Sequence, residues 1–471
     1  MAIARKIGMK IRKIKYKDHP VLKDLELNLV NPDTDKPYST IVLAGENGTG
    51  KTTILSTLNT FLCLHTFKPF ERIEYEVEGK KYAAVPTDNE TSSKFGFYNR
   101  LDLETNVSTN IITNFNNNRD QVKIDTLDIR HYGCVYSKAR ADFSVKKITG
   151  TTSLEIDADS YDDDSKEDFS SLKQLIIDLQ YDDSTKLQER IEASPTHSLS
   201  TADYEDFSKT AKMYRFRTAF DNFFETIKYK KVESADGEKK VLFAKHETDI
   251  TIDDLSTGEK QIVYRGIYLL RNSGNLDGAA VMIDEPELSM HPKWQRRILK
   301  YFKDLFTGND GTQKVQLFFA THSEYVLGEA LEDKNDTLVI VLKDNAGTIE
   351  KHEVKMPFAL PTITASEINY VAFGVPSIDY HIALYGAIQS KYGVHYITDC
   401  DNKIASCIPY YDETKHKRPT QNPNKPSSPY ITVCTKVRNN IDHPDTAPAY
   451  TDEEMADSIE LMRAILRNVA P

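Results

Sequence analysis

Short apolar runs that alternate with helical patterns dominate much of the chain. Residues 40–44, "TIVLA", predict a buried strand that leads through a glycine-rich loop into a helix over residues 51–64. Between residues 277 and 343, apolar runs are separated by helical segments, an order typical of a parallel α/β sheet. The strands predicted there are residues 279–284, 315–322 and 337–342.

Alternation of polar and apolar positions marks the segments around that first strand. Residues 65–133 alternate in this way between turn residues, so they predict an antiparallel β lobe. Residues 10–17, "KIRKIKYK", set apolar side chains among lysines. We interpret them as an edge strand with a charged outer side, because lysine is common on exposed sheet edges.

A partly helical insertion is predicted at about residues 150–250. Residues 155–170 are too acidic to be buried and predict a mobile loop. Helical periodicity follows in residues 171–183 and 212–227, and residues 228–246 predict a β-hairpin.

Pro357 and Pro361 mark a linker between two domains. Residues 1–350 predict an α/β domain that carries the antiparallel β lobe and the helical insertion. Residues 366–471 predict a small all-α C-terminal domain. Its longest helical patterns are residues 378–393 and 451–466.

Composition narrows the class of protein without changing the fold prediction. Of the 471 residues, 39% are hydrophobic and 28% are charged, and the net charge of −11 does not favour general binding to nucleic acid or acidic membranes. The five cysteines form no close pair in the sequence, which fits a reducing cytosol. No run reaches the ~18 apolar residues that a membrane helix requires. We therefore expect a cytoplasmic protein with no membrane contact.

A phosphate-binding loop stands between the first strand and its helix. The stretch from Gly45 to Thr53, "GENGTGKTT", fits the pattern G-x-x-x-x-G-K-[ST]. Glycines let backbone N–H groups curl around a phosphate, and the helix that follows directs its N-terminus at the same anion. We expect ATP to be bound by the loop and by the first residues of the helix. These residues are Asn47, Gly48, Gly50, Lys51, Thr52 and Thr53.

An acidic pair follows a later apolar strand, in "AAVMIDEPELSMHP". Asp284 ends the strand and is predicted to bind Mg²⁺ together with the hydroxyl of Thr52. Glu285 is predicted to polarise the attacking water, because phosphoryl transfer requires an oriented nucleophile.

Two further stretches carry a family resemblance. Residues 255–259, "LSTGE", look like the LSxGE signature of ABC-type ATPases, and residues 321–323, "THS", resemble their switch histidine at a strand end. "PELSMHPKWQ" looks like the D-loop of the branch that contains the recombination and SMC-like ATPases. The order of the motifs also matches. The resemblance covers roughly residues 1–345 and implies an ABC-type P-loop ATPase, of a kind that is common in bacterial anti-phage defence.

This resemblance implies a composite site. In ABC-type ATPases the signature completes the ATP site of a partner subunit, a role that would fall here to Ser256, Gly258 and Glu259. Two ATP molecules would then be held between two heads, so a homodimer or a higher homo-oligomer is expected. His322 would contact the γ-phosphate.

One family feature has no convincing counterpart in the sequence. The family places a glutamine after the β lobe to sense Mg²⁺, and here the corresponding stretch is "HYGCVYSKARADF". We assign related work to Arg140 or Ser137.

The C-terminal stretch "CTKVRNNIDHPD" offers a second chemistry. Arg438 and His443 fit R-x4-H, which resembles the motif of HEPN ribonucleases. In that chemistry a histidine takes the 2′-OH proton and an arginine stabilises the charged phosphorane. The two side chains are offset by roughly 140° on a helix, so they would converge only at a helix end or between two chains. Pro444 predicts a helix end at His443.

Several readings of the C-terminal domain stay open. Its layout resembles the anticodon-nuclease toxins, in which an ABC-type head restrains a HEPN ribonuclease, and this implies an RNA (tRNA) substrate. The domain could instead be a helical docking module or an unrelated tail. The ATPase could also hold a separate nuclease subunit, as in the Septu and PARIS systems. Asp399 and Asp401 offer an acidic pair for an in-chain TOPRIM site, but the expected upstream glutamate is missing. A DNA repair ATPase of the RecF/SMC-like kind is a further alternative.

Overall fold

The computed structural model divides the chain into two compact units, residues 1–353 and residues 354–471. The residues described by the structure are 8–116, 119–138, 161–163, 169–235, 237–270, 277–308, 311–421, 429–445 and 447–468. Within these ranges, no helix combines the length and the apolar character that crossing a membrane requires.

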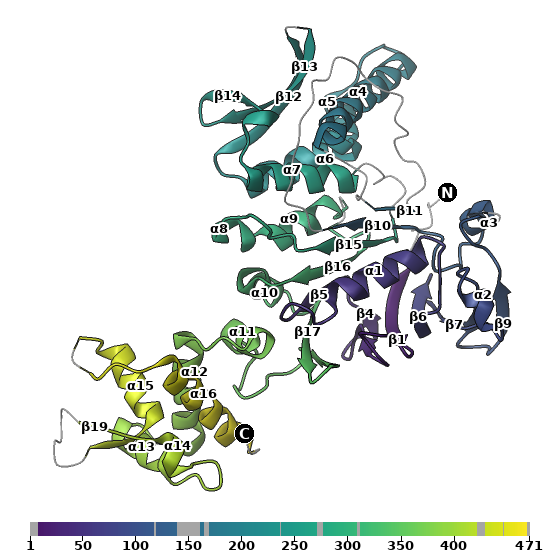
Figure 1. The fold of residues 1–471 in the computed structure, drawn as a ribbon. Coiled ribbons are helices and arrows are strands. Elements are labelled where there is room, and N and C mark those ends of the chain that lie inside the picture. Colours follow the sequence, from purple (N-terminus) through teal and green to yellow (C-terminus); the bar gives the residue numbers. More distant parts are fainter. Residues whose placement is uncertain are drawn as a thin grey trace. The chain divides into compact units, whose positions relative to one another are not determined.

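A mostly parallel sheet forms the centre of the first unit (Figure 1). In the described part of the chain its strand order is β11-β10-β15-β16-β5-β17-β18, and every neighbouring pair is parallel except β17 with β18. The parallel α/β sheet expected from the apolar runs is therefore confirmed. The strands are β5 (Thr40–Ala44), β10 (Cys134–Ser137), β11 (Tyr161–Asp163), β15 (Ala280–Asp284), β16 (Gln316–Thr321), β17 (Thr337–Asn345) and β18 (Thr348–Glu353).

A second sheet is antiparallel and has the order β2-β1-β6-β7-β8-β9. The β lobe predicted for residues 65–133 is therefore confirmed. Its strands are β1 (Lys10–Tyr16), β2 (Glu26–Asn28), β6 (Phe70–Val77), β7 (Lys80–Val85), β8 (Tyr98–Asp102) and β9 (Ser108–Ile111). Short elements nearby are β3 (Val30–Asn31), β4 (Lys36–Pro37), α2 (Glu90–Ser93) and α3 (Arg119–Ile124).

The prediction that residues 10–17 form an edge strand is wrong. Strand β1 pairs with β2 on one side and with β6 on the other. The Lys13 and Lys15 ammonium groups bind Glu26 and Glu71 of those neighbours at 2.9 and 2.7 Å. The lysines therefore meet glutamates across the sheet, and they do not protect a free edge.

Helix α1 (Lys51–Leu62) lies between the two sheets. The Phe61 ring packs on Phe70 of β6 and on Tyr98 of β8, with ring centroids 6.0 and 5.6 Å apart. Helices α7 (Thr257–Leu270) and α9 (Ile298–Leu305) belong to the opposite side of the parallel sheet (Figure 1), where Phe302 of α9 packs on Phe319 of β16. The remaining helices of this region are α8 (Pro292–Gln295) and α10 (Glu324–Ala330).

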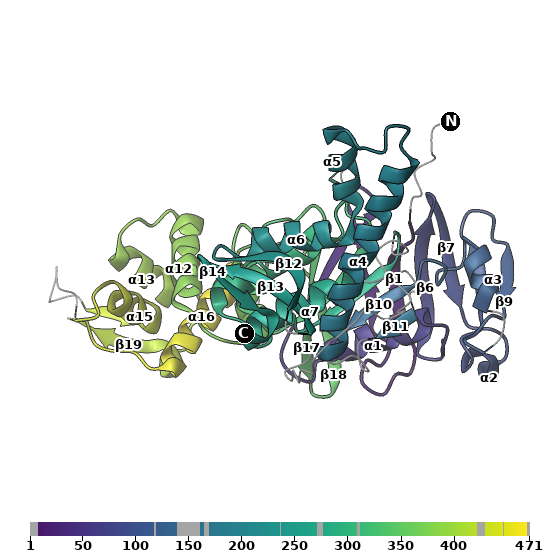
Figure 2. The ribbon, with the colours of Figure 1, turned by 90° about the horizontal axis from the view of Figure 1, so that it is seen from above.

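The predicted insertion contains helices and then strands. Figure 2 shows the long helix α4 beside α6, and the hairpin expected from residues 228–246 is confirmed as the antiparallel pair β12 and β13. The acidic loop predicted for residues 155–170 lies largely outside the described residues. The elements are α4 (Phe169–Ala193), α5 (Thr201–Thr210), α6 (Lys212–Phe223), β12 (Ile227–Ala235), β13 (Glu238–Lys245), β14 (Thr248–Thr251) and the 3₁₀ turn η2 (Ile252–Asp254).

The second unit is mainly helical, as predicted, and α12, α15 and α16 enclose its core. Leu384, Val437 and Ile459 are fully buried there. A short antiparallel pair, β19 with β20, departs from an all-α domain. The elements are α11 (Ala365–Phe373), α12 (Ile378–Tyr392), α13 (Ile397–Ala405), α14 (Glu413–His416), β19 (Lys417–Thr420), β20 (Tyr430–Thr432), α15 (Val433–Asp442) and α16 (Asp452–Arg467).

Candidate functional site

The phosphate loop joins β5 to α1 and turns through three glycines with positive φ angles. Gly45, Gly48 and Gly50 have φ angles of 147°, 83° and 86°. A Cβ atom added at Gly45 would lie 2.2 Å from the carbonyl oxygen of Leu342, so a side chain does not fit there. At Gly48 the same test meets open space. The loop therefore needs glycine for its backbone path and leaves its outer side free to receive a ligand.

Lys51 is buried, and its ammonium group lies over this loop. Its Nζ atom donates to the carbonyl oxygens of Gly45 and Glu46 at 2.8 and 2.7 Å. Burial lowers the pKa of Lys51 to about 8, while the nearby acids Glu285 and Asp284 act in the opposite direction. The side chain is still mostly charged at neutral pH, so it can exchange carbonyl partners for phosphate oxygens.

Asp284 ends β15 and receives hydrogen bonds from two other elements. The Thr52 hydroxyl at the start of α1 donates to Oδ1 at 3.3 Å, and the Tyr136 hydroxyl on β10 donates to Oδ2 at 3.1 Å. Burial raises the pKa of the Asp284 carboxyl, and both hydrogen bonds oppose that rise. The structure thus brings together the two residues that the sequence predicted as metal ligands. It also shows that the Tyr136 hydroxyl bonds one of them, Asp284.

Glu285 and His322 face each other at the ends of neighbouring parallel strands. The Nε2 atom of His322 lies 3.0 Å from Oε1 of Glu285, and both side chains are about 30% exposed. Glu285 has a positive φ of 44°, and its backbone N–H donates to the Ala320 carbonyl of β16 at 2.9 Å. A non-glycine residue in this conformation is strained, and such strain is concentrated at functional sites.

Glu287 holds the backbone that carries His322, and sequence reasoning missed it. Its Oε1 atom accepts from the Thr321 hydroxyl at 2.7 Å and from the His322 backbone N–H at 2.8 Å. Burial raises the pKa of its carboxyl. Its position two residues after Glu285 in "DEPEL" is the only sequence signal for this role.

Arg265 ties α7 to the same strand ends and was also missed. The side chain is 1% exposed, and its Nη1 atom donates to the carbonyl oxygen of Asp284 at 2.8 Å. Its Nη2 atom donates to the carbonyl oxygens of Lys138 and Glu285 at 3.2 and 3.3 Å. One guanidinium therefore fixes the backbone that carries the acidic pair.

The signature residues begin α7 with reciprocal hydrogen bonds. The Ser256 backbone N–H donates to Oε2 of Glu259 at 2.8 Å, and the Glu259 backbone N–H donates to the Ser256 hydroxyl at 3.4 Å. Lys245 of β13 holds the other Glu259 oxygen at 3.0 Å. A Cβ atom at Gly258 would lie 2.8 Å from the Ser289 carbonyl oxygen, so glycine is needed for this close packing. Ser256 itself is exposed.

The other candidate residues near the loop differ in their position and exposure. Asn47 is exposed in the phosphate loop, and Thr53 is half-buried in the first turn of α1. Ser137 is fully buried at the end of β10, and Arg140 lies outside the described residues. The residue before Ser137 is Tyr136, which the sequence did not single out, and its hydroxyl bonds Asp284.

In the second unit, Arg438 and His443 lie on and just after α15. Arg438 forms an ion pair with Asp442 at 2.7 Å, and its guanidinium lies 5.8 Å from the centre of the Tyr385 ring. α15 ends at Asp442 and His443 caps it, as the following proline predicts. His443 is exposed. The structure places the arginine against Asp442, and it records no bond between Arg438 and His443 among the described residues.

Asp401 is a structural residue of the second unit. Its carboxylate is buried and accepts from the backbone N–H groups of Ile431 and Thr432 at 2.6 and 3.0 Å. It also accepts from the Thr432 hydroxyl at 2.6 Å. These bonds fix β20 to the start of α15, which accounts for Asp401 without a metal site shared with Asp399.

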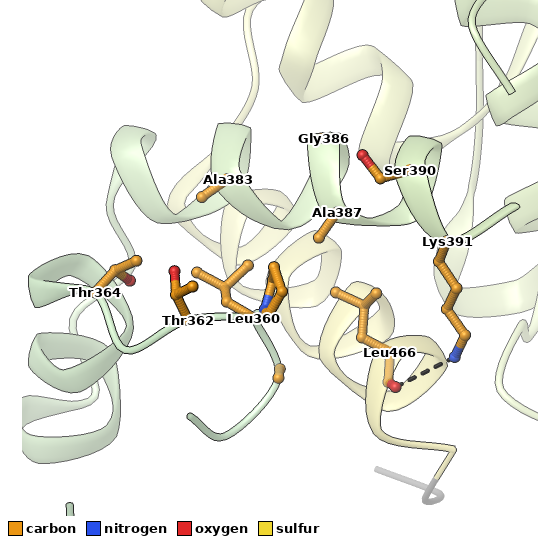
Figure 3. Close-up of a pocket in the computed structure, with 11 residues that line it drawn as sticks. Leu360, Thr362, Thr364, Ala383, Gly386, Ala387, Ser390, Lys391 and Leu466 are labelled. Atoms are coloured by element: carbon orange, nitrogen blue, oxygen red, sulfur yellow. Dashed lines mark hydrogen bonds between the residues drawn. The ribbon is translucent and has the colours of Figure 1, made fainter. Parts of the chain in front are cut away.

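A cavity of about 600 Å³ lies along α12 in the second unit (Figure 3). Small side chains of α12, among them Ala383 and Ala387, form one wall. Lys391 closes one end and donates to the Leu466 carbonyl oxygen at 3.2 Å. Neither Arg438 nor His443 lines this cavity.

The residues around the phosphate loop fit a bound nucleotide and magnesium. The loop offers a glycine backbone and the Lys51 ammonium to phosphates. Thr52 and Asp284 offer a hydroxyl and a carboxylate, the oxygen donors that Mg²⁺ prefers.

Comparison with known proteins adds three solved structures. The SMC head domain from Thermotoga maritima has 13% sequence identity, covers 74% of this chain and 100% of its own, and gives a TM-score of 0.37. The second structure is an Smc head domain with an extended coiled coil, bound to the C-terminal domain of ScpA and derived from Pyrococcus furiosus. It has 12% sequence identity, covers 74% of this chain and 96% of its own, and gives a TM-score of 0.36. The third structure is an SmcHead bound to the C-winged helix domain of ScpA. It has 11% sequence identity, covers 73% of this chain and 98% of its own, and gives a TM-score of 0.37.

Among curated proteins, no sequence matches this chain. A family model does match residues 41–328, a segment that contains the phosphate loop, the signature, the acidic pair and His322. By this match the chain belongs to the P-loop ATPase family described as "AAA domain, putative AbiEii toxin, Type IV TA system".

Proposed function

We propose that this chain binds and hydrolyses ATP between two copies of itself, and that this cycle gates a toxic nuclease in anti-phage defence. The observation that carries the ATPase part is the Glu285–His322 pair at 3.0 Å, next to the Thr52–Asp284 contact at 3.3 Å. A paired acid and histidine beside a phosphate loop is an arrangement suited to orienting a water molecule for phosphoryl transfer.

Binding uses the first turn of α1. The Lys51 ammonium leaves the carbonyl oxygens of Gly45 and Glu46 and binds the β- and γ-phosphates. Thr52 and Asp284 would hold Mg²⁺, and the ion would supply positive charge beside the phosphates. Tyr136 keeps the Asp284 carboxylate oriented for this task.

Hydrolysis uses the strand ends. Glu285 accepts a hydrogen bond from the attacking water and aligns it with the γ-phosphate, while His322 holds the carboxylate at 3.0 Å. Glu287 fixes the His322 backbone, and Arg265 fixes the Glu285 backbone. These supports keep the water-binding geometry in place before ATP arrives.

The signature acts on a partner subunit. Ser256 is exposed at the start of α7, where backbone N–H groups can bind a γ-phosphate. Glu259 and Lys245 hold this helix start in position. ATP then joins two copies of the chain, and hydrolysis separates them.

The toxin part of this proposal is supported by the family description, which names a toxin and a type IV TA system. We propose a built-in HEPN-like ribonuclease, with Arg438 and His443 acting on RNA and with a tRNA as the candidate substrate. The competing proposal is a regulatory ATPase that holds and releases a separate nuclease, and the second unit would then be the docking module. A DNA repair ATPase of the SMC-like kind is the third candidate.

The decisive experiment for the ATPase uses Glu285→Gln. This variant keeps the phosphate loop but cannot polarise water, so it should accumulate as an ATP-bound dimer. Lys51→Ala is the matched control, because it should lose nucleotide binding. Mass measured by light scattering with ATP and Mg²⁺ reads the result. A Glu285→Gln protein that binds ATP but stays at the mass of one chain would refute the sandwich.

A further inference from the structure

Two cysteines that are distant in the sequence meet between the two sheets of the first unit. Cys63 caps the C-terminus of α1, and Cys134 is the first residue of β10. Their Sγ atoms are 3.3 Å apart. Both thiols also lie near the Oδ1 atom of Asn59, at 3.6 and 3.4 Å. The two side chains therefore point at each other around one shared acceptor.

The pair is buried, but one member reaches the surface. Cys134 is 0% exposed and Cys63 is 7% exposed. Of the two residues, Cys63 is therefore the one that has contact with solvent. The other three cysteines, Cys400, Cys407 and Cys434, all belong to the second unit.

We propose that Cys63 and Cys134 form a site of reversible oxidation, at which a small hydroperoxide converts the two thiols into a disulfide. The Cys63 sulfur attacks one oxygen of hydrogen peroxide as the O–O bond breaks and becomes a sulfenic acid, while the other oxygen leaves as hydroxide and takes up the proton released by the thiol to give water. The Cys134 thiol then attacks that sulfur, the S–S bond forms, and a second water leaves. Two thiols lose two electrons and two protons, and one peroxide becomes two waters.

The geometry needs only a small adjustment. A disulfide has an S–S length of about 2.05 Å, so the sulfurs have to approach from the 3.3 Å of the reduced form. The end of a helix can supply this movement, because Cys63 already lies outside the regular turns of α1. A low-molecular-weight thiol would reverse the reaction by thiol–disulfide exchange.

The bond would tie two parts of the nucleotide site together. α1 begins with Lys51 and Thr52, and β10 carries Tyr136, whose hydroxyl bonds Asp284. The cross-link would join residues 71 positions apart and enclose strands β6 to β9. A loop of this length removes much of the freedom of the unfolded chain, so the oxidised form should unfold at a higher temperature.

The test treats the full chain with hydrogen peroxide, quenches it in acid, blocks free thiols and maps the peptides by mass spectrometry. We expect a peptide pair joined through Cys63 and Cys134, and its loss on treatment with dithiothreitol. The midpoint of thermal unfolding should rise by several degrees on oxidation of the native protein. Cys134→Ser should show no rise, whereas Cys407→Ser, a matched change in the second unit, should behave like the unchanged chain.

Peptide mapping of the unaltered chain keeps the proposal testable even if a serine variant folds poorly. Cys407 is half-buried and serves as an internal standard for the peroxide dose. If Cys407 is oxidised while Cys63 and Cys134 are both recovered as free thiols, the proposal is overturned. A linked peptide that forms equally well in the urea-unfolded chain would also overturn it, because the fold would then contribute nothing.

Discussion

The hydroxyl of Tyr136 lies 3.1 Å from Oδ2 of Asp284, on the side of the carboxylate opposite to Thr52. A buried carboxylate whose two oxygens accept hydrogen bonds from two different residues has little freedom to rotate. Tyr136 therefore helps to orient the Asp284 carboxylate, and the sequence did not single it out.

Tyr136→Phe should weaken the binding of Mg²⁺ at the nucleotide site. The change leaves the Asp284 Oδ2 atom without this donor, and a hydrogen bond to a charged group is worth roughly 1.5 kcal/mol or more. The Mg²⁺ concentration at half-saturation should rise about tenfold. Titration with Mg²⁺ in the presence of a fluorescent ATP analogue measures this midpoint.

A matched tyrosine controls for the lost hydroxyl. Tyr75→Phe removes a hydrogen bond of 2.9 Å from the Tyr75 hydroxyl to the Leu127 carbonyl oxygen in the β lobe. Its Mg²⁺ midpoint should match that of the unaltered chain. If both variants shift the midpoint equally, Tyr136 has no special link to the metal.

Ser256→Arg should abolish turnover while the same chain still binds ATP through Lys51. The long side chain would occupy the position of the partner's γ-phosphate, whereas Ser256→Thr keeps the helix-capping hydroxyl and should retain most of the activity. Mixing Ser256→Arg with Lys51→Ala gives heterodimers with one intact composite site. ATPase activity that stays at background after heterodimers are shown to form would exclude action between subunits.

Glu329 makes the stability of the first unit depend on pH. Its two carboxylate oxygens accept from the backbone N–H groups of Leu299 and Lys300, both at 2.8 Å, and burial raises its pKa from 4.5 to about 7. The folded state then holds a proton that the unfolded state releases. The stabilisation is complete below pH 4.5 and is lost as the pH rises through about 7.

Glu329→Gln should flatten this dependence. The amide cannot titrate, so the fall in unfolding free energy between pH 5 and 7 should shrink by about 2 kcal/mol. Glu324→Gln, at an exposed position of the same helix, should leave the slope unchanged. Urea unfolding of the first unit at several pH values gives the comparison. An identical slope in Glu329→Gln and the unaltered chain would contradict the assignment.

The sequence predicted the strand-loop-helix unit and the parallel sheet, because glycine spacing and apolar runs are local signals. It could not predict the partners across the sheet. Tyr136 lies opposite Met282 in the β10–β15 register, two positions before Asp284, and that register decides which side chain meets the carboxylate. The edge-strand error at β1 has the same cause. Local lysines gave no sign that β2 and β6 would bring glutamates to both sides.

The sequence also could not predict contacts between distant residues, because these contacts depend on how the helices and strands pack. In the sequence, Arg265 is a single charged residue in an apolar helical stretch. Only the packing of α7 beside β15 brings its guanidinium to the Asp284 carbonyl oxygen. Cys63 and Cys134 likewise meet only because α1 lies beside β10. In the second unit, the R-x4-H spacing gave no indication that Asp442 would hold Arg438 at 2.7 Å.

The ribonuclease proposal predicts that His443→Ala abolishes RNA cleavage and toxicity while ATPase activity stays near that of the unaltered chain. His443 is exposed at the end of α15, so its loss should not disturb the fold. His395, another exposed histidine of the same unit, gives the matched control His395→Ala, which should remain toxic. Cleavage products should carry a 2′,3′-cyclic phosphate, because the 2′-OH is the nucleophile in this chemistry.

The ion pair with Asp442 sharpens this last prediction. An arginine that binds a carboxylate at 2.7 Å has to release it before it can bind a phosphate. Asp442→Asn should therefore raise cleavage several-fold, and Arg438→Ala should remove it. RNA from cells that express each variant, separated by size and end-labelled, measures both changes. If the chain alone, expressed with its trigger, leaves all RNA intact, the second unit is a docking module and the nuclease belongs to a partner protein.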